Sequence, residues 1–166
     1  MAFVLKSRAF GAHQNIPVRY TCDGEQVSPP LAWSGAPQNT VTFALIVEDP
    51  DAPRGTFTHW VLFNIPGNVD HLDENVPWVQ SLDDGTVQEN NDFGAPGYGA
   101  PCPPPGESHH YRFTLYALDA DIPLQAGASK QQLIVAMQRH RLDQAQLIGT
   151  YARQSPVLGT QARQRR

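Results

Sequence analysis

Two aspartates, two histidines and a tyrosine lie at the ends of apolar segments, and their types suit the binding of a small charged molecule. Asp49 and Asp51 belong to DPDAP, His59 opens HWVLFNI, and His109 and Tyr111 open HHYRFTLYAL. Imidazole and phenol groups donate hydrogen bonds to phosphate or carboxylate oxygens. A carboxylate instead binds an ammonium group or fixes the tautomer of a neighbouring histidine. A zwitterion that carries a phosphate and an amine would satisfy the whole set.

Three segments must position these groups, and each is typical of a β-strand. Residues 41–48 and 111–118 alternate in side-chain character, whereas residues 59–65 are almost continuously apolar, as in a central strand covered on both faces. We expect the three segments to pair in one sheet, with 111–118 antiparallel to 41–48. Asp49 would then end one strand where the others begin.

The alternation of side chains along a strand assigns each polar group to a face. Asp49 extends the apolar face of 41–47, and His109 and Tyr111 extend the face of 113–115. By the same parity His59 shares its face with Val61, Phe63 and Ile65. The sequence therefore predicts that the four groups converge at one rim of the sheet, walled by the Pro- and Gly-rich loops 50–58 and 92–108.

The rest of the chain predicts a mainly β domain with little helix. Fifteen prolines and thirteen glycines separate short apolar runs. Residues 129–141 favour a helix that begins at the N-cap Ser129, and 147–153 favour a short strand. We expect one domain over 1–153 and a flexible basic C-terminal tail over 154–166.

Charge and hydropathy exclude two broad classes. A net charge of −4 argues against a nucleic-acid surface, because neutralising phosphates needs a basic excess. No run approaches the roughly 18 apolar residues of a membrane span, and no signal peptide is recognisable. We expect a soluble, cytoplasmic protein. Cys22 and Cys102 would then be free thiols, with a single bridge between them as the alternative.

Three segments follow one another along the chain: CDGEQVSPPLAW, DPDAP followed by THWVLFNIPG, and PPPGESHHYRFTLYALD. In order and spacing they resemble the phosphatidylethanolamine-binding protein family. Any one of them alone is weak evidence, but three in succession over one short domain are specific. The resemblance covers about residues 3–153 and is to the bacterial branch that is similar to Raf kinase inhibitor proteins.

The resemblance implies a large central antiparallel sheet packed on a smaller second sheet, with a few short helices. It also implies a shallow anion-binding pocket without a cofactor, for phosphate or a phosphoethanolamine head group. The pocket residues it implies are Asp49, Asp51, Pro53, His59, Pro103, His109 and Tyr111. A kinase or protease partner and a regulatory role are implied by the resemblance alone, and a homodimer stays open.

Two details of the family pattern bear on this sequence. One peptide bond of the DPDAP loop is expected to be cis, as is typical of family members. The family commonly has arginine where this chain has His110, which puts in doubt any ion pair of that arginine. The neighbouring side chain points to the opposite face of a strand, so the pocket should survive the change.

Two alternatives use the same atoms. A histidine positioned by Asp49 could act as the general base of a hydrolase, but no GxSxG motif or other recognisable nucleophile is present. His59, His109 and Asp49 could also bind iron or zinc, although no motif places two of them on adjacent turns. We expect a non-enzymatic binding protein without a metal.

Overall fold

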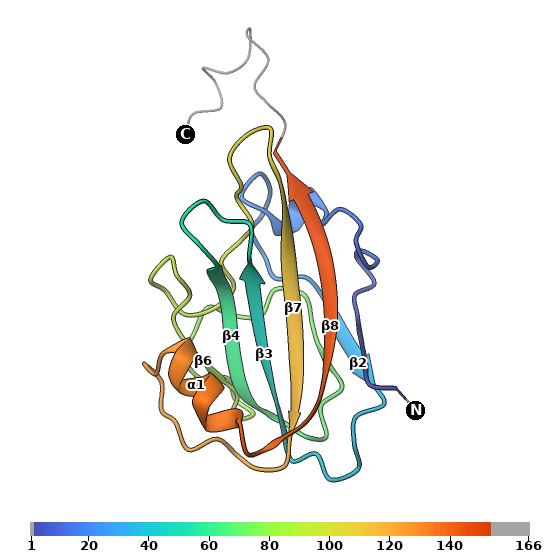
Figure 1. Ribbon diagram of the computed structural model, residues 1–166, viewed down its shortest axis with the longest axis vertical. Coiled ribbons are helices and arrows are strands. Elements are labelled where there is room, and N and C mark those ends of the chain that lie inside the picture. The colour runs from blue at the N-terminus through green and yellow to red at the C-terminus, as the bar shows by residue number, and fades with distance from the viewer. Residues whose placement is uncertain (1, 154–166) are drawn as a thin grey trace, which may run out of the picture.

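The computed structural model describes residues 2–153, which form two antiparallel sheets (Figure 1). The small sheet has the order β1 (Val4–Lys6), β2 (Leu31–Ser34), β5 (His71–Leu72). The large sheet has the order β6 (Val87–Gln88), β4 (Phe57–Pro66), β3 (Thr42–Asp49), β7 (Ser108–Leu118), β8 (Arg141–Ala152). The helical elements are the 3-10 turn η1 (Val18–Tyr20) and α1 (Lys130–Met137). The predicted fold class is confirmed.

The pairing of the three central strands is also as predicted. β3 pairs antiparallel with β4 on one side and β7 on the other, with Asp49 opposite Phe57 and Glu48 opposite Arg112. The end of β3 therefore meets the beginnings of β4 and β7 at one end of the sheet, the upper end in Figure 1.

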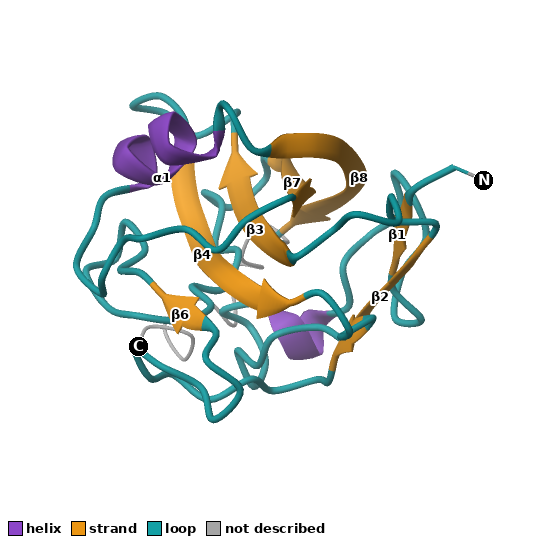
Figure 2. Cartoon of the chain, turned by 90° about the horizontal axis from the view of Figure 1, so that it is seen from below, coloured by secondary structure: helices purple, strands orange, loops and turns teal. Residues whose placement is uncertain are grey.

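The large sheet is apolar on both faces because each face is covered. Figure 2 shows it lying between α1 and the small sheet. Toward the small sheet, the core contains Leu5, Trp33, Phe43, Leu45, Val47, Trp60, Phe113 and Leu115. Toward α1, it contains Ala44, Ile46, Val61, Phe63, Leu118, Leu133 and Met137. Covering on both faces explains why β3 and β4 are so continuously apolar.

The predicted parity of β4 is wrong. Val61 and Phe63 face α1, whereas His59 lies on the opposite face with the core under the small sheet. The register with β3 shifts between the pairs Val47–Trp60 and Glu48–Thr58, so β4 contains a bulge at His59. A second shift precedes Ile65, which returns to the face of the small sheet. The bulge lets His59 and Trp60 both face that side.

The predicted helix over 129–141 is too long, and the strand that follows it is longer than predicted. Ser129 is the N-cap, and its side chain accepts from the backbone N–H of Gln132 in a capping box, as expected. The helix ends at Met137, however, and β8 begins at Arg141 and pairs with β7 along its whole length. This pairing overrides the local helical pattern. None of the described helices is long and apolar enough to cross a membrane.

The prediction of free thiols is wrong, because Cys22 and Cys102 form a disulfide. The bridge joins the turn after η1 to the loop that precedes β7, and the backbone N–H of Cys22 also donates to the carbonyl of Pro101 at 3.0 Å. Sequence cannot show the separation of two cysteines that lie 80 positions apart. The predicted tail, 154–166, lies outside the described residues.

Candidate functional site

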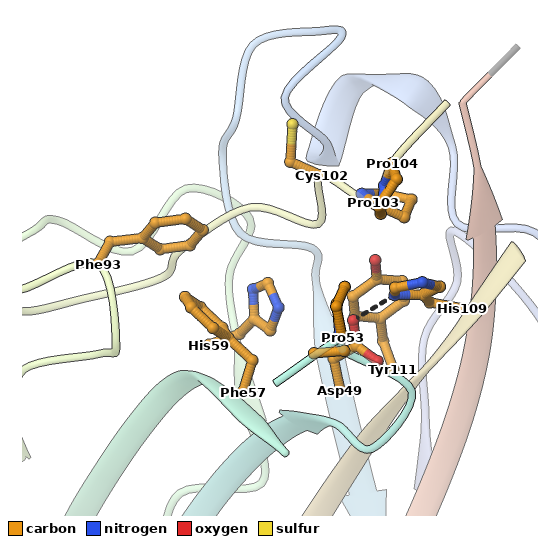
Figure 3. Close-up of a pocket in the computed structure, with 11 residues that line it drawn as sticks. Asp49, Pro53, Phe57, His59, Phe93, Cys102, Pro103, Pro104, His109 and Tyr111 are labelled. Carbon is orange, nitrogen blue, oxygen red and sulfur yellow. Dashed lines mark hydrogen bonds and ion pairs between the residues drawn. The ribbon is translucent and has the colours of Figure 1, made fainter. Parts of the chain in front are cut away.

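A cavity of about 130 Å³ opens at the end of the sheet where β3 ends and β4 and β7 begin. Figure 3 shows side chains from these strands and from the two flanking loops gathered around it. Its lining residues are Asp49, Ala52, Pro53, Phe57, His59, Phe93, Cys102, Pro103, Pro104, His109 and Tyr111. Six of the seven residues expected in the pocket are therefore brought together.

The His109 side of the cavity is a buried ion pair. The Nδ1 atom of His109 donates to Oδ2 of Asp49 at 2.7 Å, and the two side chains are 4% and 5% exposed. On the other side of the ring, Nε2 lies 3.0 Å from Oε1 of Glu107. Burial disfavours the charged ring, but the hydrogen bonds to Asp49 and Glu107 outweigh it and raise the pKa of His109. This side of the cavity therefore favours the protonated ring, with one carboxylate at each of its two nitrogen atoms.

His59 has the opposite electrostatic environment. Burial lowers its pKa, so the ring is neutral near pH 7. Nδ1 lies 2.6 Å from the carbonyl oxygen of Gly99. A carbonyl only accepts, so Nδ1 carries the proton and Nε2 carries a lone pair. His59 therefore offers an acceptor rather than the donor that the residue type suggested, and it becomes a donor only by binding a proton.

Tyr111 lies between the two histidines, and its ring is fully buried. Its hydroxyl has no hydrogen-bond partner among residues 2–153. Burial and the nearby charges of Asp49 and Asp51 raise the pKa of Tyr111, so the phenol keeps its proton. Leaving a buried hydroxyl unpaired costs about 1–3 kcal/mol, which a ligand oxygen in the cavity would recover.

Asp51 is the predicted pocket residue that does not line the cavity. Its Oδ2 accepts from the backbone N–H and from Nδ1 of His110, at 2.8 and 2.7 Å. The hydrogen bond from the His110 side chain, followed by that from its backbone, lowers the pKa of Asp51. His110 thus forms hydrogen bonds to an acidic side chain at the position where the missing arginine had put an ion pair in doubt. Asp51 fastens the DPDAP loop to β7.

The DPDAP loop contains no cis peptide bond, and none occurs elsewhere in the described chain, so the expectation of one is wrong. The backbone N–H of Asp51 donates to Oδ1 of Asp49 at 2.8 Å and closes the beginning of the turn. A second contact, from the N–H of Gly55 to the carbonyl of Ala52, closes the tip of the loop. Pro53 reaches the cavity wall on this loop.

Several residues of the site escaped the sequence reasoning. Phe57 and Glu107 each lie two positions before a predicted histidine, so strand periodicity could have found them. Phe93 carried no such signal. It comes from the loop after β6, and its ring centroid lies 5.7 Å from that of His59 and 4.7 Å from that of Phe57. Cys102 also lines the cavity, directly before the predicted pocket residue Pro103.

The site does not have the arrangement of a metal centre. Among the described residues, no three His, Cys, Asp or Glu side chains are grouped so that they could bind an ion together. Asp49 already accepts from His109 and from the Asp51 backbone. The donor set instead suits a ligand with oxygen atoms.

The fold and site define a class of β-proteins in which a small cavity with a few polar side chains lies at the end of the larger of two sheets. The sequence profile described as phosphatidylethanolamine-binding protein matches residues 6–152. The chain belongs to this family.

Relatives match over nearly the whole chain. A UPF0098 protein of Methanothermobacter thermautotrophicus is 53% identical over 149 residues, which cover 90% of this chain and 98% of the relative. A UPF0098 protein of Aquifex aeolicus is 45% identical over 149 residues, which cover 89% and 86%.

Two crystal structures have the same fold. One is a phosphatidylethanolamine-binding protein homologue from Chlamydia trachomatis, with a TM-score of 0.84 and 38% identity over 92% of this chain and 98% of that chain. The other is YbcL of E. coli, described as a member of the mammalian family, with a TM-score of 0.82 and 32% identity over 92% and 99%.

Proposed function

We propose that the protein binds a small phosphate-bearing ligand, such as a phosphoethanolamine head group, and does not transform it. The observation that carries this proposal is the buried hydroxyl of Tyr111, which has no partner within the described chain and belongs to a residue that lines the cavity. A phosphate oxygen would accept from Tyr111 and, in place of Glu107, from Nε2 of a cationic His109. The size of the cavity, about 130 Å³, suits a group of this size.

The asymmetry of the site also supports a ligand that carries donors as well as acceptors. The Nε2 lone pair of His59 would accept from an ammonium N–H or from a protonated phosphate oxygen. The carboxylate of Asp49 would favour the ammonium electrostatically. We therefore expect phosphoethanolamine to bind more tightly than inorganic phosphate, and ethanolamine alone to bind most weakly.

The lining argues for binding rather than hydrolysis. Among the described residues, the cavity lining includes no serine or threonine, and the sulfur of Cys102 is in the disulfide. The lining therefore offers no hydroxyl of serine or threonine and no free thiol as a nucleophile. Turnover of a chromogenic phosphate ester that disappears in His59→Ala would contradict this part of the proposal.

The test is a titration with phosphoethanolamine, followed through the ring NMR signals of the histidines. The signals of His59 and His109 should shift, and that of His140, which pairs with Asp119 at the surface, should not. His109→Gln should weaken binding, whereas the control His140→Gln should leave it unchanged. Silent His59 and His109 signals at millimolar ligand would overturn the proposal.

Two further expectations stay predictions. A regulatory role toward a kinase or a protease would be tested by recovering a partner from host lysate with the wild type and with His109→Gln. The expected cytoplasmic location is not supported by free thiols, because Cys22 and Cys102 form a disulfide, and disulfides are more typical of an oxidising compartment.

A further inference from the structure

A second cavity, of about 270 Å³, lies beside the first. Phe93 and Cys102 line both cavities, so they form a shared wall. The remaining residues of the second lining are Cys22, Gln26, Trp78, Asn91, Ala95, Pro96, Tyr98, Gly99 and Ala100. None of these other residues borders the first cavity. The ionisable side chains Asp49, His59 and His109 line the first cavity and not the second.

The second cavity is largely apolar, because two of its polar side chains already form hydrogen bonds within the protein. The side-chain amide of Asn91 donates to the carbonyl of Gly97 at 2.8 Å and accepts from the backbone N–H of Phe93 at 2.9 Å. The hydroxyl of Tyr98 donates to the carbonyl of Tyr20 at 2.7 Å. Both polar groups are therefore held within the protein. The surfaces left for contact are mainly aromatic rings, small apolar side chains and the disulfide, with the side-chain amide of Gln26 as the remaining polar group.

Two aromatic side chains at this cavity are exposed yet held in place. Trp78 is 59% exposed and Phe93 is 57% exposed. A Cβ atom at Gly97 would lie 2.8 Å from Cδ1 of Trp78, and one at Gly99 would lie 2.5 Å from Cδ2 of Phe93. The two rings thus pack directly on the backbone of glycines, where a side chain would leave no room for them. Exposed, preformed aromatic surface of this kind is typical of a binding site.

The first cavity is too small for a large phosphate ester. A volume of about 130 Å³ is smaller than the cavity of about 150 Å³ that holds one benzene ring in an engineered protein core. The substituent of an ester bound through its phosphate must therefore leave the first cavity. Phe93 packs near His59 on the first cavity and also lines the second, so a substituent that crosses Phe93 enters the apolar space.

We propose that the second cavity is a subsite for a flat aromatic substituent of a phosphate ester whose phosphate occupies the first cavity. The inference rests on the proposed function, because it needs the phosphate beside His109. The rings of Trp78, Phe93 and Tyr98 favour a flat partner, since aromatic groups pack edge-to-face or offset on one another. The volume is sufficient for one or two fused rings.

The experiment compares inorganic phosphate, phenyl phosphate, 1-naphthyl phosphate and hexyl phosphate by isothermal titration calorimetry. The naphthyl ester should bind at least about tenfold more tightly than inorganic phosphate, with the phenyl ester between them. Trp78→Ala should remove most of this gain and change the affinity for inorganic phosphate less than about twofold. Val79→Ala, at an exposed neighbour outside the lining, is the matched control.

A second variant guards against a structural effect of Trp78→Ala. Ala95→Phe fills the cavity from an exposed position and should also abolish the gain while inorganic phosphate still binds. Equal affinities for phosphate and its naphthyl ester, or a gain that survives in both variants, would overturn the subsite and leave the proposed function standing. Tighter binding of hexyl phosphate would overturn the assignment to a flat group. Failure of every phosphate to bind would overturn both proposals.

Discussion

The two sides of the first cavity place the same residue type in opposite electrostatic environments. His109 lies on a strand, between the carboxylates of Asp49 and Glu107. His59 lies at a bulge and donates to the carbonyl of Gly99, which belongs to a loop. Burial acts against the charged form of both rings. Two carboxylates outweigh it and raise the pKa of His109, whereas at His59 burial outweighs the hydrogen bond to a neutral carbonyl and lowers the pKa. The partner, not the residue type, decides which ring is charged.

This difference makes the cavity directional. The His109 side donates from a cation, and the His59 side accepts through a lone pair. A ligand with a negative group at one end and a donor at the other fits in one orientation only. A site with two equivalent imidazoles would instead bind a symmetric anion equally well in either direction.

The largest expected effect on stability concerns the loop that contains Gly99, the hydrogen-bond partner of His59, and Cys102. The Cys22–Cys102 bridge spans 80 positions, and a loop of this length is stabilised by about 4 kcal/mol in the chain-entropy account. Replacing both cysteines with serine should lower the free energy of unfolding by about that amount, measured by urea denaturation. The ring signal of His59 should shift more than that of His109. Equal shifts would contradict the division of the site into a loop side and a strand side.

The next largest effect is the difference in the free energy of unfolding that is lost when each histidine is replaced. His109→Leu leaves the buried carboxylate of Asp49 without its partner and should cost about 3 kcal/mol. His59→Leu removes one hydrogen bond to a neutral carbonyl and should cost about 1 kcal/mol. Chemical denaturation at pH 7 measures both. Adding Asp49→Asn to His109→Leu should recover part of the loss, and no recovery would show that the carboxylate is not the cause.

The sequence was sufficient to predict the convergence of the site where the strands are regular. Asp49, His109 and Tyr111 follow the alternation of β3 and β7, and their faces came out as expected. His59 reached the site for a different reason than parity, because the bulge before Trp60 depends on register with β3. Register is a property of two strands, so a pattern within one strand cannot reveal it.

Short or polar strands escaped prediction for related reasons. β1, β2 and β5 contain three, four and two residues, too few for a period to emerge. The first half of β8 is largely polar and exposed, and it forms because β7 supplies its backbone partners. The same holds for Phe93, which a long loop brings to His59 without any local signal.

A smaller effect is the dependence of stability on pH. The folded pKa of His109 is raised, so its stabilisation is complete below about pH 6.5 and is lost as the pH rises through the folded pKa. The folded pKa of His59 is lowered, so stability falls as the pH drops from about 6.5 toward that pKa. Thermal unfolding of His109→Gln should lack the alkaline loss, and that of His59→Gln the acidic loss. If the pH dependence of stability changed in the same way in both variants, the two histidines would not differ in their electrostatic environment as described.

The smallest expected effect is a change in phosphate affinity at the His109 side of the cavity. Glu107 occupies the Nε2 atom that a phosphate would use, and its side chain is 57% exposed. Glu107→Gln should therefore increase phosphate affinity about two- to fivefold at pH 6, in proportion to an exposed ion pair, and high salt should reduce the gain. Asp70→Asn, at an exposed carboxylate that pairs with His71, controls for net charge. A lower affinity in Glu107→Gln would mean that the carboxylate serves mainly to keep His109 charged, and the donor side of the cavity would then depend on two acids rather than on Asp49.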